Sequence, residues 1–386
     1  MSRPVGTLAP PAIRYGLAAA FDLARGLAFA WAAMLVLVGT AAAETLLVVR
    51  KSADALDFVD PGSGLRLASV PVGGTPHEVS VSPNGRVAIV SNYGTPEAPG
   101  STVSVIDLVH PRELRRIDLL PHTRPHGVHW SAADRVAITT QGSGSLVVVD
   151  PFAGKVLAAH PTRQDITHMV TVAADRRIAY VANVGSGSVS ALSLDDDAPP
   201  RTVTTGAGTE GLALTPDGRE VWATVRNEGA VLVLDSRTLD TLARMPLPGA
   251  PIRVAFGPDG ARAYVSCAGS AEVVMFDVHQ RRELARRKID VPVAAAAVLR
   301  LATKLAPGSS IPVGLAVSHD GRTVYVAATM ADRVVELDAS TLAVLRSVDV
   351  AGEPDGLGVT DVLPQAQCHA CAPPPEPTPE DPATTH

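Results

Sequence analysis

Aromatic side chains, cysteines and excess basic charge are all scarce in this chain of 386 residues. Only 4% of the residues are aromatic, which disfavours a sugar-binding cleft lined with tryptophan and a base-stacking surface. Three cysteines are too few for a disulfide-stabilised scaffold. The formal net charge of −6 leaves no domain-wide basic surface for a phosphate backbone, so we expect no nucleic-acid partner.

Motifs of common phosphate-binding and hydrolytic sites are also missing. The sequence contains no glycine-rich phosphate loop, no G-x-S-x-G nucleophile elbow and no H-E-x-x-H zinc helix. Cys368 and Cys371 resemble a haem-attachment pair, but Ala372 stands where c-type attachment requires histidine. The sequence therefore predicts no haem. The two thiols are expected to form a local disulfide or, with His369, to bind copper or zinc loosely.

Glycine and proline, in contrast, are abundant, with 32 residues of each. This supply of turn residues favours many short strands over a helical bundle. Hydrophobic residues make up 46% of the chain, which is enough for a large core.

The two ends of the chain differ in composition from its body. Residues 1–43 have the pattern of an export signal: basic residues, the apolar stretch Leu27–Val38, and alanines before Glu44. The stretch is shorter than the roughly 20 residues that span a bilayer. We expect a periplasmic or secreted protein with no transmembrane span after cleavage; an uncleaved anchor is the alternative. Residues 361–386 are proline-rich and acidic, which predicts a disordered tail.

The body is an internal repeat. Each copy has an apolar pair, a tight turn such as Pro-Asn-Gly or Pro-Asp-Gly, and further short apolar strands. Successive copies are 49, 42, 42, 42, 61 and 42 residues apart. Their first apolar residues are Val79, Val128, Val170, Leu212, Val254, Leu315 and Leu357.

Each copy has room for about four short strands, whose sheet cannot bury both faces alone. Seven such sheets packed radially can, and ring closure removes the exposed edges. The sequence therefore predicts an all-β, seven-bladed β-propeller over residues 44–360. The last strand, near Leu357, is expected to pair with the N-terminal blade and close the ring. A helical solenoid is the competing architecture, but only residues 293–304 have a helical period.

The strand cores Ala179–Asn183 (AYVAN), Ala263–Cys267 (AYVSC) and Val324–Ala328 (VYVAA) resemble the YVTN β-propeller repeat family. The resemblance covers nearly the whole chain after residue 43. That family includes exported propellers without a known role, surface-layer proteins and lactonase-like enzymes. The resemblance therefore implies the fold and an exported location more specifically than a function.

The innermost strand of each blade lines the central channel of a propeller, so its first residues form the channel mouth. The position two before each apolar anchor carries carboxylates and imidazoles in blades 1 to 5 and aliphatic side chains in blades 6 and 7. In blade order these residues are Asp355, His77, His126, His168, Glu210, Ile252 and Val313.

Imidazole ligands suit zinc and copper, so His77, His126, His168 and Glu210 are predicted metal ligands. The alternative is that these side chains only line a water-filled polar channel. Loop residues on the same face add candidate ligand-binding groups: Lys51, Asn92, Arg226 and Arg253.

Two functional hypotheses remain. The first is an exported, monomeric binding module whose mouth takes a metal ion, a small ligand or a partner protein. The second is a lactonase-like, metal-assisted hydrolase in which Glu210 or Asp355 is the catalytic base. Two insertions lengthen the loops, at residues 95–100 and 292–310. The second contains a possible amphipathic helix, Val293–Ala306, as a lid or docking element.

Overall fold

The computed structural model describes residue 1 and residues 44–293 and 310–365. The described residues from Glu44 to Gln365 form one compact unit. The predicted leader after residue 1, most of the 292–310 insertion and the tail from residue 366, with Cys368 and Cys371, lie outside the described residues. Within the described ranges, no helix has the length and apolar character needed to cross a membrane.

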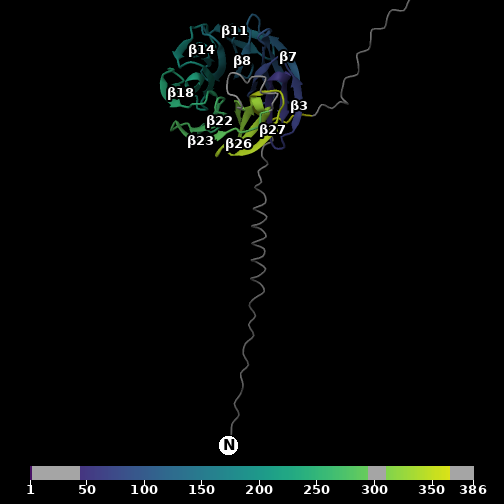
Figure 1. Ribbon diagram of the computed structural model, residues 1–386. Coiled ribbons are helices and arrows are strands. Elements are labelled where there is room, and N and C mark those ends of the chain that lie inside the picture. The colour runs from purple at the N-terminus through teal and green to yellow at the C-terminus, as the bar shows by residue number, and fades with distance from the viewer. Residues whose placement is uncertain (2–43, 294–309, 366–386) are drawn as a thin grey trace, which may run out of the picture. The chain divides into compact units, whose positions relative to one another are not determined.

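Seven four-stranded antiparallel sheets are arranged around a central axis, which confirms the predicted seven-bladed β-propeller (Figure 1). Blade 1 contains, from the inside out, β28 (Pro354–Thr360), β1 (Thr45–Arg50), β2 (Ala55–Val59) and β3 (Arg66–Pro71). Blade 2 contains β4 (Pro76–Val81), β5 (Val87–Gly94), β6 (Pro99–Asp107) and β7 (Arg112–Asp118). Blade 3 contains β8 (Pro125–Ala132), β9 (Arg135–Thr140), β10 (Ser145–Asp150) and β11 (Lys155–Pro161).

The remaining blades follow the same order. Blade 4 contains β12 (Thr167–Ala173), β13 (Ile178–Asn183), β14 (Ser188–Ser193) and β15 (Arg201–Thr204). Blade 5 contains β16 (Thr209–Leu214), β17 (Glu220–Val225), β18 (Ala230–Asp235) and β19 (Thr241–Pro246). Blade 6 contains β20 (Pro251–Phe256), β21 (Arg262–Cys267), β22 (Glu272–Asp277) and β23 (Arg282–Lys288). Blade 7 contains β24 (Pro312–Val317), β25 (Thr323–Ala328), β26 (Arg333–Asp338) and β27 (Val344–Asp349). Three short 3-10 helices are described: η1 (Lys51–Ala53), η2 (Arg226–Glu228) and η3 (Thr329–Ala331).

The ring closes as the repeat predicts. The C-terminal strand β28 pairs antiparallel with β1, with Leu46 opposite Val359 and Leu47 opposite Gly358. Thr360 Oγ1 donates a hydrogen bond of 2.7 Å to Gly85 O in blade 2. The first and last strands of the propeller thus share one sheet, and both sides of β1 are paired, with β28 and with β2.

The Pro-Asn-Gly and Pro-Asp-Gly turns join the first two strands of their blades. Gly85, Gly218 and Gly260 adopt φ values of 73°, 71° and 69°, a left-handed conformation that glycine adopts without steric cost. In blade 2, Gly85 N donates to Ser82 O over 2.8 Å. The turns therefore face the end of the channel opposite to the start of the inner strands.

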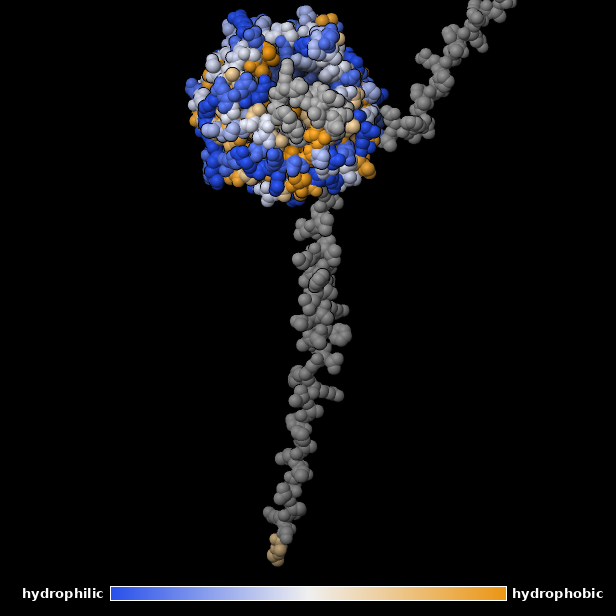
Figure 2. Space-filling model, viewed as in Figure 1, coloured by the Kyte–Doolittle hydropathy of each residue, from blue (hydrophilic) through white to orange (hydrophobic). Residues whose placement is uncertain are grey.

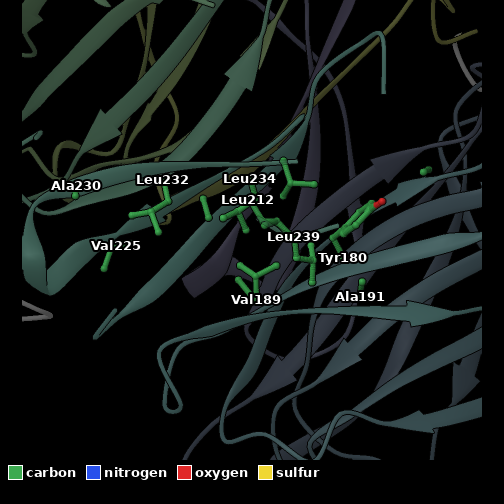
Figure 3. Packing of buried hydrophobic residues seen from close by; sticks show 13 residues of the cluster. Tyr180, Val189, Ala191, Leu212, Val225, Ala230, Leu232, Leu234 and Leu239 are labelled. Atoms are coloured by element: carbon green, nitrogen blue, oxygen red, sulfur yellow. The ribbon is translucent and has the colours of Figure 1, made fainter. Parts of the chain in front are cut away.

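The hydrophobic core lies between neighbouring blades. One cluster joins blades 4 and 5, with Tyr180 and Val189 packed near Leu212 and Leu232 (Figure 3). The tyrosine of the repeat motif also reaches the next blade, because Tyr180 Oη donates to Ser236 O over 2.5 Å. The rim seen in Figure 2 is mostly hydrophilic, and its hydrophobic areas are small and separate. This distribution is ordinary for a folded domain.

Candidate binding site at the channel mouth

The channel mouth is formed where the seven inner strands begin. In every described blade, the pairing of the inner strand is irregular at this point, for example between Pro76 and Val79 in β4 and between Thr167 and Val170 in β12. A bulge breaks the regular alternation of a strand and re-aims the side chain that it contains. The predicted mouth residues all lie at these irregularities.

The five polar mouth residues, which we call the polar arc, are neighbours. His77 Nδ1 lies 3.0 Å from Asp355 Oδ2. The ring centroid of His126 lies 4.9 Å from that of His77 and 3.9 Å from that of His168. His168 Nε2 in turn lies 3.8 Å from Glu210 Oε1. The structure thus brings together side chains from successive repeats and, through ring closure, Asp355 of the last repeat with His77 of the first.

The other side of the mouth is apolar. Ile252 of blade 6 packs with Ala268, Ile311 and Met330, and Val313 of blade 7 lies against this cluster. The seven predicted mouth positions are therefore asymmetric, with polar side chains in blades 1 to 5 and apolar side chains in blades 6 and 7.

The next residue along each inner strand decides whether neighbouring strands approach closely. It is glycine in four blades: a Cβ atom at Gly314 would lie 1.9 Å from Asp355 O, and one at Gly127 would lie 2.7 Å from His168 O. Only glycine fits such close backbone approaches. In the other blades this position carries a side chain: Glu78, Met169 and Arg253.

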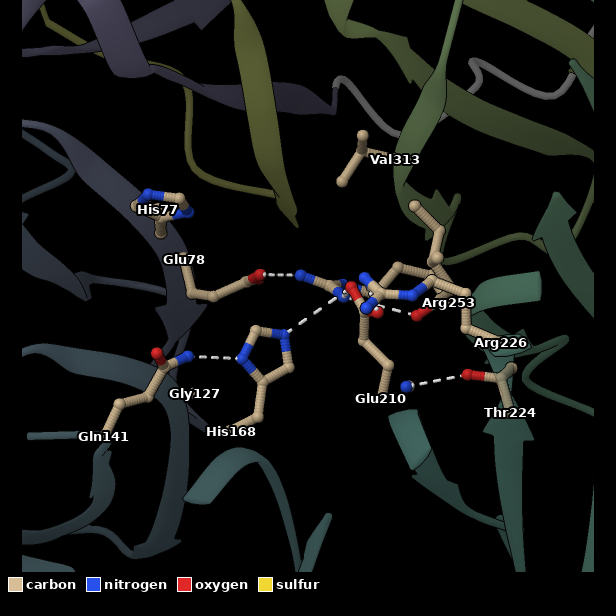
Figure 4. A network of polar contacts seen from close by, with 12 residues as sticks. His77, Glu78, Gly127, Gln141, His168, Glu210, Thr224, Arg226, Arg253 and Val313 are labelled. Atoms are coloured by element: carbon tan, nitrogen blue, oxygen red, sulfur yellow. Dashed lines mark hydrogen bonds and ion pairs between the residues drawn. The ribbon is translucent and has the colours of Figure 1, made fainter. Parts of the chain in front are cut away.

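Glu78 and Arg253 meet across the channel, from blade 2 to blade 6. Arg253 Nη2 donates to Glu78 Oε1, and Arg253 Nη1 lies 4.0 Å from Glu210 Oε1 (Figure 4). The side chains of Glu78 and Arg253 are only 12% and 9% exposed. This cross-channel pair thus places two buried charged side chains in the channel beside the polar arc.

Burial perturbs the carboxyl groups of the mouth. It raises the pKa of Glu78 and that of Glu210, although Arg253 and, for Glu210, Arg226 oppose the rise. Burial would also raise the pKa of Asp355, but the charges of Lys51 and His77 and a hydrogen bond from His77 hold that pKa below its usual range. Glu210 is therefore the better proton acceptor of the two predicted bases.

Two of the three arc histidines are held neutral. Burial, and then the neighbouring positive groups, lower the pKa of His126 and that of His168 well below the ordinary value of 6.5. His126 Nδ1 and His168 Nε2 are buried and have no hydrogen-bond partner among the described residues. A buried polar atom without a partner is costly, so these two nitrogens indicate a site for a ligand or water.

A second row of polar groups supports His168. Gln141 Nε2 donates to His168 Nδ1 (Figure 4). Behind it, Tyr93 Oη donates to Gln141 Oε1 over 2.7 Å. The guanidinium of Arg124 lies 5.2 Å from the centre of the Tyr93 ring. These contacts fix the orientation of the His168 ring.

The four candidate ligand-binding residues fall into two groups. Lys51 Nζ lies 3.7 Å from Asp355 Oδ2, and Arg226 Nη1 lies 2.6 Å from Glu210 Oε2, so both cations border the polar arc, as does Arg253. Asn92 lies inside blade 2 and is 1% exposed; it accepts from Gly73 N and donates to hydroxyls of β6. Its amide is therefore fully used within the fold.

A group of closely spaced candidate metal-ligand atoms lies outside the channel mouth. Among residues 44–293 and 310–365, three candidate ligand atoms within 4.8 Å of one another are found in Glu44, His319 and Asp361. This group lies at the opposite end of the channel, where β1 begins and β28 ends. In the mouth, the rings of His126 and His168 are stacked beside each other, tilted by 33°.

Comparisons with known proteins support the propeller fold. A family model described as "Cytochrome D1 heme domain" matches residues 130–255. No curated protein matches the chain. The hydrazine synthase of Kuenenia stuttgartiensis is 18% identical with a TM-score of 0.64, over 77% of this chain and 93% of that one. The periplasmic gluconolactonase PpgL of Pseudomonas aeruginosa is 20% identical with a TM-score of 0.63, over 82% and 99%.

A third similar structure is a functionally unknown protein from Desulfotomaculum acetoxidans DSM 771, 12% identical with a TM-score of 0.67, over 83% of this chain and 99% of that one. At such identities the likeness shows the fold alone. The resemblance to YVTN repeats is thus supported as a propeller resemblance, while that specific family stays a prediction.

The prediction of a copper or zinc cofactor without haem is corrected by the family match, which points to a haem-related propeller family. The argument from Ala372 concerned covalent attachment only. Haem bound without a covalent link takes ligands from distant residues, which leave no contiguous motif. Of the mouth residues, His126 fits such a group, because its buried Nδ1 has no hydrogen-bond partner among the described residues and would serve as an iron ligand. The cations Lys51 and Arg226 are paired with Asp355 and Glu210. Haem, when bound, would supply a redox-active iron.

Sequence reasoning missed Glu78 and Tyr93. A signal for Glu78 was present, because it stands where Gly127, Gly211 and Gly314 stand in other blades. A large charged side chain at a position of close strand approach must point into the channel. No comparable signal marked Tyr93, which belongs to the lengthened β5–β6 hairpin of blade 2.

Proposed function

We propose that this chain is a binding propeller that holds a small polar ligand at its channel mouth, against the polar arc. The observation that carries the proposal is the pair of neutral, buried imidazoles with unpartnered nitrogens, His126 Nδ1 and His168 Nε2. A ligand that hydrogen-bonds to both would remove two desolvation penalties of roughly 1–3 kcal/mol each.

The charges around the polar arc are largely paired. Glu78 and Arg253 form an ion pair across the channel. The cations at the rim, Lys51 and Arg226, are each matched by a carboxylate. Recognition therefore rests on hydrogen bonds and shape more than on net charge.

Calorimetric titration tests the proposal with two probes: D-gluconate and glucono-δ-lactone. We expect one of them to bind, and the double variant His126→Ala/His168→Ala to lose affinity at least tenfold. The control is His110→Ala/His279→Ala, which removes two exposed histidines from turns at the other end of the propeller. No binding of any probe, or equal affinity of the double variant and the control, would contradict the proposal.

We also propose that the propeller works outside the cytoplasm, on the basis of the export pattern in residues 1–43. N-terminal sequencing of the protein recovered from the periplasm or medium should begin at Glu44. A protein that keeps residues 1–43 would overturn this point.

A second candidate function is hydrolysis of a lactone, favoured by Glu210. Burial raises the pKa of its carboxyl group, which suits a general base that works near neutral pH. Glu210 would take a proton from a water molecule while the water oxygen attacks the lactone carbonyl carbon. The ring C–O bond then breaks, and the proton passes to the departing alkoxide to give a hydroxy acid.

Turnover separates the two functions. Hydrolysis of a lactone panel that is lost in Glu210→Gln, while binding of the lactone persists, would place the enzyme ahead of the binding module. Turnover that is unchanged in Glu210→Gln would exclude Glu210 as the base.

A further inference from the structure

Two consecutive hydrogen bonds, each with a defined donor, lead to His168 of the polar arc. This chain of hydrogen bonds begins at Tyr93 in β5, passes through Gln141, which directly follows β9, and ends on Nδ1 of His168 in β12. Three blade elements that are far apart in sequence thus meet at one imidazole. The phenol ring is held on two sides, by the Arg124 guanidinium at 5.2 Å and the His77 ring at 4.8 Å.

The direction of this chain is set by the Gln141 amide, whose oxygen faces Tyr93 and whose nitrogen faces His168. Tyr93 Oη has a single proton, and the acceptor described for it is Gln141 Oε1 at 2.7 Å. With its oxygen facing Tyr93, the Gln141 amide presents its nitrogen to His168, so His168 Nδ1 accepts. A neutral imidazole that accepts at one nitrogen carries its proton on the other. The proton of His168 therefore lies on Nε2.

This proton has no acceptor within the described part of the chain. The nearest carboxylate oxygen paired with it, Glu210 Oε1, lies 3.8 Å away, beyond hydrogen-bonding distance. Glu210 is already engaged by Arg226 at 2.6 Å. His77 has the opposite arrangement, because the Asp355 carboxylate lies 3.0 Å from its Nδ1 and requires the proton there.

We propose that Tyr93 and Gln141 are positioning residues that hold the His168 proton on Nε2, so that the mouth recognises a ligand oxygen, either carbonyl or carboxylate. The proposal rests on the proposed function and names the chemical class of its ligand. The same N–H would polarise a lactone carbonyl next to Glu210 if the protein is a hydrolase. Neither positioning residue needs to touch the ligand.

Nitrogen NMR on the full mature propeller tests the position of the proton without any ligand. With ¹⁵N-histidine labelling, the His168 signals are assigned by their absence in His168→Gln. We expect a protonated-type shift for Nε2 and an unprotonated-type shift for Nδ1. In Gln141→Glu the carboxylate attracts a proton to Nδ1, so the Nδ1 signal should move to the protonated range, whereas in Gln280→Glu, a matched change on an exposed turn, neither signal should move.

Affinity for D-gluconate and glucono-δ-lactone completes the test. We expect at least tenfold weaker binding in Gln141→Glu, a smaller loss in Tyr93→Phe, and wild-type binding in Gln280→Glu. A protonated Nδ1 in the wild type, or wild-type affinity in Gln141→Glu, overturns this inference even when the proposed function stands. Wild-type protein that shows the expected proton position but binds neither probe overturns the ligand class and the proposed function, and leaves the positioning roles supported.

Discussion

The two ends of the central channel carry the same kinds of side chain in different environments. At the mouth, Asp355 is 4% exposed and its partner His77 is 20% exposed. At the opposite end, His319 Nδ1 lies 2.7 Å from Asp361 Oδ1, but these side chains are 50% and 63% exposed. Lys51 and His77 hold the pKa of the buried Asp355 below its usual range, whereas an exposed pair of charged groups contributes little to stability. Burial, more than residue type, distinguishes the mouth from the opposite end of the channel.

Breaking the cross-channel pair should have the largest effect. Arg253→Met leaves Glu78 buried without its partner, and losing one member of a buried ion pair costs roughly 3–5 kcal/mol of unfolding free energy. Urea unfolding measures the change. Arg322→Met, at the opposite end with a side chain 85% exposed, is the control and should stay within about 0.5 kcal/mol of wild type.

The double variant Arg253→Met/Glu78→Leu should recover much of the loss, because both buried charges are then gone. A loss below about 1 kcal/mol in the single variant would mean that Glu78 is reached by water once Arg253 is removed. The channel would then be open to water at the level of Glu78.

The arc histidines should make stability fall in mild acid. Their pKa values in the folded protein lie well below 6.5, so the unfolded chain takes up protons below pH 6.5 that the folded protein does not. Each histidine therefore lowers the unfolding free energy by up to about 1.4 kcal/mol per pH unit. Glu78 and Glu210, whose pKa values are raised, act in the opposite direction as they protonate in the folded state.

Urea unfolding at pH 7.5, 6.5 and 5.5 measures the net slope. The variant His126→Gln/His168→Gln should show a shallower loss below pH 6.5 than wild type. Gln280→Ala, on an exposed turn, removes no titrating group and should leave the slope unchanged. Parallel slopes for wild type and the double variant would show that the two histidines are solvated in the folded protein.

Much of this site could be predicted from the sequence, because the repeat period sets it. The anchors Val79, Val128 and Val170 place one blade each, and counting two residues back identifies His77, His126 and His168 as neighbours. This inference needs only the count of blades and the position of a residue along its strand.

Contacts across the channel could not be predicted from the repeat period. Glu78 and Arg253 are 175 residues apart, and their contact depends on the channel width and on side-chain length. For Asn92, the position along the strand was not enough to predict where the side chain lies. A polar residue at a strand end was expected to face the mouth, but it is bound by Thr102 and Ser104 of the neighbouring strand β6.

Close packing of the inner strands gives a smaller effect. Gly314→Ala would place a Cβ atom 1.9 Å from Asp355 O, so the two strands must separate. Such overpacking costs roughly 1–3 kcal/mol, and the displacement of Asp355 should also weaken ligand binding. Gly74→Ala, which meets nothing within 4 Å, is the matched control. Equal stability of the two variants would show that the inner strands can move apart freely.

The smallest effect is expected at the exposed His319–Asp361 pair, at the end of the channel opposite the mouth. Asp361→Asn removes the charge that faces His319 Nδ1, and an exposed pair of this kind contributes about 0–1 kcal/mol. Glu44 should still hold the turn, because its Oε2 accepts from His319 N over 2.8 Å and its Oε1 accepts from Tyr325 Oη over 2.9 Å. Urea unfolding at low and high salt measures the difference. A loss of more than about 2 kcal/mol would show that the His319–Asp361 pair helps to close the ring, and that exposure alone does not separate the two ends of the channel.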